Sequence, residues 1–358
     1  MTLPEALIAL GYSDRVAALA ADEVAAGRTI ARVSRSDRGY VFVATADGPL
    51  IARPSTRLVK AAADGELPVA GDWVALDTEA TEPEVEAVLP RMTAICRRDP
   101  GRAARVQVLA ANVDVVFITH PLSDPPNLSR IERELALVWD SGARPVVVLT
   151  KCDLAEDAAA ARDETAAIAP GVDVILSSAL DGDGLEEVRV FLGAGQTVAL
   201  IGPSGSGKST LINALAGADI RETREVRVTD HRGRHTTVSR ELVPLPGGGL
   251  VVDTPGLRAV GMWDSAEGLD QAFSDIAGLA EECRFRDCTH GDEPGCAVVA
   301  AVEAGTLPAR RLESYRELQA EIRFVTGERD LRAREERKRN DKQLARAIKR
   351  YYKSGGTG

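Results

Sequence analysis

The sequence predicts a multidomain α/β protein with an N-terminal β-barrel, a central parallel sheet covered by helices on both faces, and a helical C-terminal domain that binds a metal. Three observations predict this class. Short alternating apolar runs fill residues 29–98, apolar strands alternate with helices over residues 99–265, and three cysteines and a histidine gather within residues 266–358. Residues 1–28 are Ala-rich, and we expect them to form a helical extension that ends at Gly27.

Length and composition exclude several classes of protein. The 358 residues are 44% hydrophobic and 27% charged, as in ordinary soluble globular proteins. No apolar run approaches the roughly 20 residues of a membrane span, and no basic segment precedes an apolar core at the N-terminus. We therefore expect a cytoplasmic monomer that has no membrane partner.

Residues 29–98 favour a small barrel of the OB type. Five short strands at close spacing, separated by turn residues, are typical of such a domain. OB-type barrels often bind oligonucleotides, but a barrel that serves only for docking or packing is an equally open alternative. The five expected strands are 29–34, 39–45, 49–53, 72–77 and 84–89.

The central domain alternates apolar strands with helices, a pattern that gives a parallel sheet with helices on both faces. A ligand of such a sheet binds at the carboxyl ends of the strands. Strands are expected at 113–119, 145–150, 172–176, 196–201, 241–245 and 249–253, and helices at 128–140, 156–169, 184–191 and 209–216.

A phosphate-binding loop lies between an expected strand and an expected helix. Residues 202–209 fit G-x-x-x-x-G-K-[ST], and glycines in such a loop let backbone N–H groups point at an anion. Lys208 can reach the β- and γ-phosphates, and Ser209 supplies a hydroxyl for Mg²⁺. A Gly/Ser turn that matches by accident is the alternative. The predicted contact residues are Gly202, Pro203, Ser204, Gly205, Ser206, Gly207, Lys208, Ser209 and Thr210.

Two loops at successive strand ends indicate guanine as the base. Thr150, Lys151, Cys152 and Asp153 resemble the Asn-Lys-x-Asp element of GTPases, in which the carboxylate accepts hydrogen bonds from guanine N1–H and the 2-amino group. Adenine lacks this donor pair and would leave the carboxylate unpaired, which is costly. The alternative role of Asp153 is a helix N-cap. The second loop, Ser177, Ser178 and Ala179, matches the Ser-Ala element, whose backbone N–H contacts guanine O6.

Asp253-Thr-Pro-Gly256 matches the D-x-x-G element. In this motif we expect Asp253 to hold Mg²⁺ through water and the Gly256 N–H to contact the γ-phosphate. The base-reading elements precede the phosphate loop here, whereas in ordinary GTPases they follow it. The order predicts a circularly permuted domain. We also expect the permutation to pass the nucleotide state directly to the domain that follows Gly256.

The polar segment 221–240 lies where the first switch loop is expected. Thr236 or Thr237 is the expected hydroxyl that closes on Mg²⁺ and the γ-phosphate. Leu257 stands where many GTPases carry a Gln that orients water, so slow intrinsic hydrolysis is expected. His235 is a candidate substitute for that Gln, with a structural or phosphate contact as the alternative.

The C-terminal domain contains Cys283-x₄-Cys288-x-His290-x₅-Cys296. Three thiolates and an imidazole are the four ligands of a tetrahedral structural zinc site, and they leave no position open for catalysis. Free cysteines in a surface loop are the alternative. The chain has five cysteines in all, an odd number that favours metal binding over disulfides in a reducing compartment.

The C-terminal segment is basic although the whole chain carries a net charge of −10. Residues 329–353 hold eleven Lys and Arg against four Asp and Glu, a local charge of +7. A helical pattern begins at Pro308 and continues through this segment. Binding to a phosphate backbone is the expected role, with a solvated helical face as the alternative.

Together these motifs resemble one family, the circularly permuted bacterial GTPases of small ribosomal subunit biogenesis (RsgA, also called YjeQ), from Thr29 to Lys353. The resemblance implies an OB-fold domain, a permuted GTPase domain and a zinc domain, with 30S-stimulated GTP hydrolysis, binding to 16S rRNA and a role in late 30S maturation near the decoding region. It rests on the elements above together with Gly71-Asp-Trp-Val, Ala111-Asn-Val-Asp114, Gly233-Arg-His-Thr-Thr237, Asp253-Thr-Pro-Gly-Leu-Arg258 and Cys-Arg-Phe-Arg-Asp-Cys-Thr-His290.

One residue departs from the family pattern, since Thr150 replaces the usual Asn. A Thr can still hydrogen-bond to the phosphate loop, but with less reach, so we expect weaker nucleotide affinity and retained guanine selectivity. The sequence thus predicts a GTP hydrolase that uses Mg²⁺ and holds one structural zinc ion. The alternatives are an RNA-binding assembly factor that uses GTP only as a conformational latch, and a P-loop ATPase or kinase.

Overall fold

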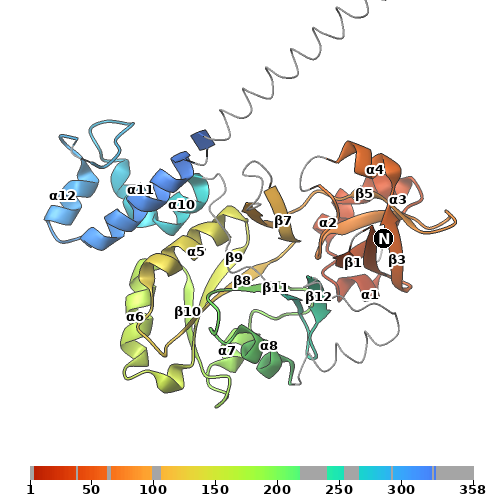
Figure 1. The fold of residues 1–358 in the computed structure, drawn as a ribbon, viewed down its shortest axis with the longest axis horizontal. Helices are drawn as coiled ribbons and strands as arrows, with labels where there is room; N and C mark the ends of the chain where they lie inside the picture. The colour runs from red at the N-terminus through yellow and green to blue at the C-terminus, as the bar shows by residue number, and fades with distance from the viewer. Residues whose placement is uncertain are drawn as a thin grey trace, which may run out of the picture.

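The computed structural model describes residues 4–37, 39–62, 66–98, 106–217, 240–253, 266–291, 293–324 and 326–327. Figure 1 shows the barrel at one side, the central sheet in the middle, and the C-terminal helices above helix α5. No helix in the described ranges has the length and apolar character needed to cross a membrane.

The N-terminal barrel is closed by five strands. Each strand pairs with two others of the five, and the only parallel pair among them is β3 with β5. Strand β1 also pairs with β12 of the central sheet, where Arg35 is opposite Glu241. Apolar side chains from alternate positions fill the interior, which explains the alternating sequence pattern. The strands are β1 (Thr29–Asp37), β2 (Tyr40–Thr45), β3 (Gly48–Pro54), β4 (Trp73–Asp77) and β5 (Glu84–Val88), with helix α4 (Thr56–Ala61) after β3.

The N-terminal segment is helical, as predicted, and packs against the barrel. The ring of Tyr12 meets the ring of Trp73 edge to face, with 5.2 Å between centroids. Leu7 and Val16 are buried in the same cluster. The three helices are α1 (Glu5–Ile8), α2 (Asp14–Leu19) and α3 (Ala21–Ala25).

The central sheet has the strand order β10-β9-β8-β11-β13-β12. All neighbours are parallel except β12, which forms an antiparallel hairpin with β13 because the short turn from Leu245 to Gly249 joins them. The sequence predicts this strand as part of a parallel sheet, and the parallel direction is wrong for β12. The strands are β8 (Val115–Pro121), β9 (Arg144–Thr150), β10 (Asp173–Ser177), β11 (Thr197–Ile201), β12 (Glu241–Pro244) and β13 (Leu250–Asp253).

Helices cover both faces of this sheet, as Figure 1 shows. Alternate strand residues face opposite sides, so Val116 and Ile118 pack with α5 whereas Val115 and Phe117 pack with α7 and α8. Asn127 begins α5, since its side chain accepts a hydrogen bond from the Arg130 N–H. The helices are α5 (Leu128–Asp140), α6 (Ala158–Ile168), α7 (Leu185–Arg189) and α8 (Lys208–Ala216). A separate hairpin, β6 (Ala94–Arg98) and β7 (Val106–Ala111), was not predicted.

Arg32 links the barrel to the central domain through hydrogen bonds. Its side chain is 2% exposed, and its guanidinium donates to the carbonyls of Leu10 and Asn112 and to the hydroxyl of Thr197. Burial lowers the pKa of Arg32 to about 10, against the opposite effect of Asp114 and Asp72. The guanidinium therefore stays protonated at neutral pH.

The motifs Gly71-Asp-Trp-Val and Ala111-Asn-Val-Asp114 meet at this junction. Gly71 has φ +91°, and a Cβ there would lie 2.1 Å from the Ala111 carbonyl oxygen, so only glycine fits. Asn112 accepts a hydrogen bond from the Met92 N–H and donates one to the Gly71 carbonyl. The Asp114 carboxylate accepts from the Thr197 N–H at 2.7 Å. These contacts fix the beginnings of β8 and β11 against the barrel.

The C-terminal helices pack on α5 and share its apolar core. Arg311 is 1% exposed and bridges the two layers, since it donates to the carboxylates of Glu132 on α5 and Asp275 on α11. The expected helix after Pro308 is present as helical residues 309–324. The other helices are α10 (Ala266–Ala272), α11 (Ser274–Ala280) and α12 (Ala297–Glu303).

Candidate functional site

The phosphate loop connects β11 to α8, in the strand–loop–helix setting that the sequence predicts. Gly202, Gly205 and Gly207 have φ of +136°, +80° and +78°, values that L side chains rarely adopt. This backbone turns toward the N-terminus of α8, and the positive end of a helix favours an anion.

Lys208 lies over the loop. Its ammonium donates to the Gly202 carbonyl at 2.9 Å, the Pro203 carbonyl at 2.7 Å and the Ser206 hydroxyl at 3.1 Å. Ser206 is buried, whereas Ser204, Gly205, Ser209 and Thr210 are exposed to solvent. The arrangement presents a positive charge and loop backbone to an incoming phosphate group.

Thr150 and Thr119 hold the loop from two neighbouring strands. The Thr150 hydroxyl at the end of β9 donates to the Ser206 carbonyl at 2.7 Å, so the hydrogen bond expected across to the phosphate loop is present. Thr119 on β8 is fully buried, and its hydroxyl is 2.8 Å from that of Ser206. Sequence reasoning missed Thr119. A polar residue near the end of an otherwise apolar strand was the available signal.

The two loops predicted to read the base follow the adjacent strands β9 and β10. Lys151 adopts the left-handed conformation with φ +56°, and the 3₁₀ turn Cys152–Leu154 follows, with Asp153 exposed. The alternative role of Asp153 as a helix cap is wrong, since Asp157 caps α6 by accepting from the Ala160 N–H at 2.9 Å.

Hydrogen bonds within the second loop, residues 177–183, hold it in place. The Ser178 N–H donates to the Asp183 carbonyl, and the Ser178 hydroxyl donates to the Asp181 carboxylate. Ser177 pairs in register with Thr150, and its buried hydroxyl has no hydrogen-bond partner in the described part of the chain. Ala179 follows at the carboxyl end of β10, on the same edge as Asp153.

The remaining predicted switch residues are largely outside the description. Asp253 ends β13, which pairs in parallel with β11 beside the phosphate loop. His235, Thr236, Thr237, Gly256 and Leu257 lie outside the described residues, as do most of segment 221–240 and the basic segment 329–353.

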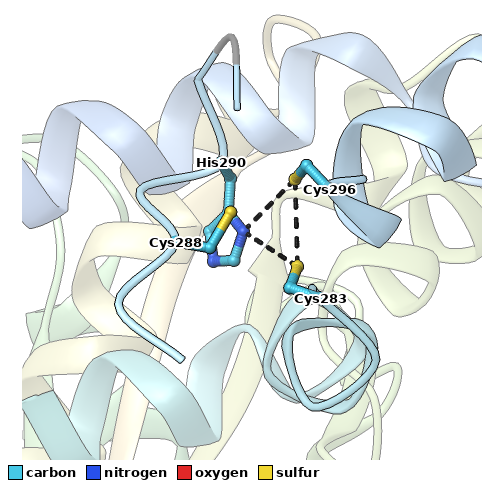
Figure 2. Close-up of side chains that lie close together, drawn as sticks. All are labelled: Cys283, Cys288, His290 and Cys296. Carbon is cyan, nitrogen blue, oxygen red and sulfur yellow. Dashed lines mark hydrogen bonds between the residues drawn. The ribbon is translucent and has the colours of Figure 1, made fainter. Parts of the chain in front are cut away.

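The four predicted metal ligands come together in the C-terminal domain. The ligand atoms of Cys283, Cys288, His290 and Cys296 all lie within 4.8 Å of one another. Figure 2 shows the three sulfur atoms and the imidazole ring gathered around one point. His290 Nδ1 is 3.7 Å from Cys283 Sγ and 3.6 Å from Cys296 Sγ, and the two sulfur atoms are 3.9 Å apart.

The spacings among Cys283, His290 and Cys296 are close to those of a tetrahedral zinc site. With Zn–S of about 2.3 Å and Zn–N of about 2.0 Å, ligand atoms of a tetrahedron lie about 3.5 to 3.8 Å apart. Burial lowers the pKa of His290, which favours the neutral imidazole that a metal binds. The donor set therefore suits Zn²⁺, and the alternative of separate free cysteines in a surface loop does not describe this cluster.

Neighbouring groups hold the ligand residues in place. His290 has φ +59°, and its carbonyl accepts a hydrogen bond from Arg316 of the helix 309–324. Cys296 begins α12, and its sulfur accepts from the Val299 N–H at 3.4 Å. Cys96 lies outside the cluster, and burial raises the pKa of its thiol to about 11. A raised pKa favours the protonated thiol at neutral pH.

Comparisons with known proteins agree with this geometry. The family described as RsgA GTPase matches residues 88–263. The small ribosomal subunit biogenesis GTPase RsgA of Streptomyces coelicolor is 47% identical over 92% of this chain and 90% of its own length. The protein of the same name from Syntrophotalea carbinolica is 42% identical over 92% of this chain and 93% of its own length.

Two solved structures are also similar to this chain. The crystal structure of YjeQ from Thermotoga maritima is similar with a TM-score of 0.63 and 27% identity, covering 82% of this chain and 98% of that chain. The structure of YloQ, described as a circularly permuted GTPase, has a TM-score of 0.60 and 26% identity, covering 83% of this chain and 95% of that chain.

Proposed function

Because this chain belongs to the RsgA family of circularly permuted GTPases and is a GTP-hydrolysing enzyme, we propose that it acts in biogenesis of the small ribosomal subunit. In this role it binds the 30S subunit, hydrolyses GTP faster when bound, and assists late maturation of the subunit. The observation that carries the proposal is the permuted set of guanine and phosphate loops along one edge of the central sheet, in a chain 47% identical to an RsgA.

At the phosphate side, the loop N–H groups and Lys208 bind the β- and γ-phosphates and stabilise the charge that develops during phosphoryl transfer. Asp253 ends β13, and Ser209 lies at the start of α8, after the adjacent strand β11. Both residues offer oxygen donors, which suit Mg²⁺. When bound there, Mg²⁺ neutralises charge on the β- and γ-oxygens. Thr236 or Thr237 and Gly256 complete the site in the triphosphate state.

At the base side, Asp153 accepts two hydrogen bonds from guanine, Lys151 lies along the base plane, and the Ala179 N–H contacts guanine O6. The exposed position of Asp153 and the proximity of the two loops on neighbouring strands support this assignment. This selectivity argues against an ATPase or kinase. A competition assay measures how strongly GTP and ATP displace bound GDP. Equal displacement by the two nucleotides would contradict the predicted guanine selectivity.

The zinc site is proposed as structural. Its four ligand positions are filled by protein, and the loop that carries them has few apolar residues of its own in the core. The zinc domain, the barrel and the basic segment 329–353 together offer the surface for 16S rRNA, which attracts Lys and Arg through its phosphates.

The hydrolysis step is proposed to depend on the ribosome. Leu257 cannot orient water, and His235 is the candidate within the chain for that role. A protein that uses GTP only as a latch is the remaining alternative, and single-turnover hydrolysis with 30S subunits distinguishes the two. A rate unchanged by the subunit favours the latch.

Binding itself is tested by co-sedimentation with purified 30S and 50S subunits. We expect the full chain to pellet with 30S in the presence of a non-hydrolysable GTP analogue and to be released with GDP. Equal recovery with 50S subunits, or no recovery with either, would contradict the proposed partner.

A further inference from the structure

Thr119 lies outside the phosphate loop, near the end of β8, yet its side chain contacts the loop. Strand β8 runs parallel to β11 with Ile118 opposite Ile201, which places Thr119 beside Gly202. A Cβ on Gly202 would lie 2.2 Å from the Thr119 carbonyl oxygen and 2.7 Å from its hydroxyl. The Thr119 hydroxyl is 2.8 Å from the Ile201 carbonyl and 2.8 Å from the Ser206 hydroxyl.

The hydrogen bonds in this group run in one direction. The Lys208 ammonium can only donate, and it donates to the Ser206 hydroxyl. The Ile201 carbonyl can only accept, so the single Thr119 proton points to it and Thr119 accepts the proton of Ser206. The chain therefore runs from Lys208 through Ser206 and Thr119 to Ile201, and each hydroxyl proton is used once. Successive hydrogen bonds in such a chain polarise one another and are thereby strengthened.

Ser206 is held from two sides. Its hydroxyl is bonded to Thr119 of β8, and its carbonyl accepts from Thr150 of β9. We propose that Thr119 is a positioning residue of the GTP site: it fixes Ser206, and with it the loop N–H groups and Lys208, in the geometry that binds the β-phosphate. The proposal rests on GTP binding at this loop and does not depend on action at the ribosome.

The test is nucleotide titration of the full chain without ribosomes. Thr119→Val keeps the side-chain shape but leaves the buried Ser206 hydroxyl without its acceptor. We expect affinity for GDP and GTP to fall roughly tenfold. Thr119→Ser restores the hydroxyl and should restore affinity. The ratio of GDP to IDP affinity should stay at the wild-type value, because the base-reading loops are untouched.

Thr165→Val is the matched control. Thr165 is also fully buried, and its hydroxyl donates to one carbonyl, that of Ala161 on α6, at 2.8 Å. Wild-type affinity in Thr119→Val, an equal loss in Thr165→Val, or failure of Thr119→Ser to rescue would each overturn the proposal.

If Thr119→Val does not fold, Ser206→Ala removes the same link from the loop side and should weaken binding of GDP and GTP. Where both fold, their combined effect should be less than additive, since they break one chain. Additive losses would contradict the proposal. Because every arm omits ribosomes, a failure of 30S stimulation would leave this result unaffected.

Discussion

At the scale of single residues, Thr150 offers one hydroxyl proton where an Asn amide would offer two. Its hydroxyl donates to the Ser206 carbonyl, so it has no proton left for Ser177, its register partner on β10. The Ser177 hydroxyl is buried and has no partner among the residues that the structure describes. An Asn side chain carries two N–H donors at a similar position.

We therefore expect Thr150→Asn to tighten GDP binding about fivefold, since one amide can serve both Ser206 and Ser177. Isothermal titration of the purified chain measures this. Thr150→Val, which removes the hydroxyl, should weaken binding. The interpretation fails if the Asn variant binds GDP no more tightly than the wild type.

Asp153 is expected to determine base selectivity. Asp153→Ala should reduce GTP affinity roughly 100-fold, because two hydrogen bonds to a charged group are lost, and it should leave the weak ATP affinity unchanged. Competition titrations with the two nucleotides measure the ratio. Asp157→Ala, which removes only the cap of α6, is the matched control. A similar loss in both variants would mean that the effect is structural.

At the scale of elements, helix 309–324 is joined to α5 through a buried ion pair. Arg311 and Glu132 have side-chain exposures of 2% and 0%, and their charged atoms are 2.9 Å apart. Arg310 contacts the same carboxylate from a side chain that is 38% exposed.

Removing Arg311 leaves the buried Glu132 carboxylate with Arg310 as its remaining cation and takes the arginine partner from Asp275. We expect Arg311→Met to destabilise the C-terminal domain by about 3 kcal/mol and Arg310→Met by less than about 1 kcal/mol. Urea unfolding followed by circular dichroism measures both. Equal shifts in the two variants would show that burial does not govern this contact.

The metal cluster is a second element with its own test. We expect about one zinc ion per chain by elemental analysis, and Cys283→Ser should lose the metal and lower the unfolding temperature. Basal GTP hydrolysis should be retained, because the cluster lies outside the nucleotide site. Cys96→Ser should keep its zinc. A variant Cys283→Ser that still holds stoichiometric zinc would contradict the assigned ligands.

The elements that could be predicted from the sequence are those set by local spacing. The barrel strands, α5, the phosphate loop and the Cys283–Cys296 cluster each depend on neighbours along the chain. The hairpin of β6 and β7 was missed because the expected domain boundary, between residues 98 and 99, separates its two strands. Arg32 and Arg311 were also missed, since their partners are distant in sequence and an arginine gives no local sign that it will be buried.

At the scale of the whole molecule, the central sheet links all three domains. The beginnings of β8 and β11 are fixed to the barrel at Arg32, and their far ends carry Thr119 and the phosphate loop. The last strand, β13, leads along the chain to α10, which packs on α5 beside the zinc domain. A partner that contacts the barrel and the zinc domain together would therefore contact two units that are both joined to the central sheet.

The measurement that tests the central claim most directly is steady-state GTP hydrolysis by the full chain, with and without purified 30S subunits. Reactions with 50S subunits and with ATP serve as controls. We predict strong stimulation by 30S alone and for GTP alone, which would make Leu257 and His235 the next residues to vary. A hydrolysis rate that 30S subunits do not change, or that 50S subunits raise equally, would contradict the account and favour a protein that uses GTP only as a latch.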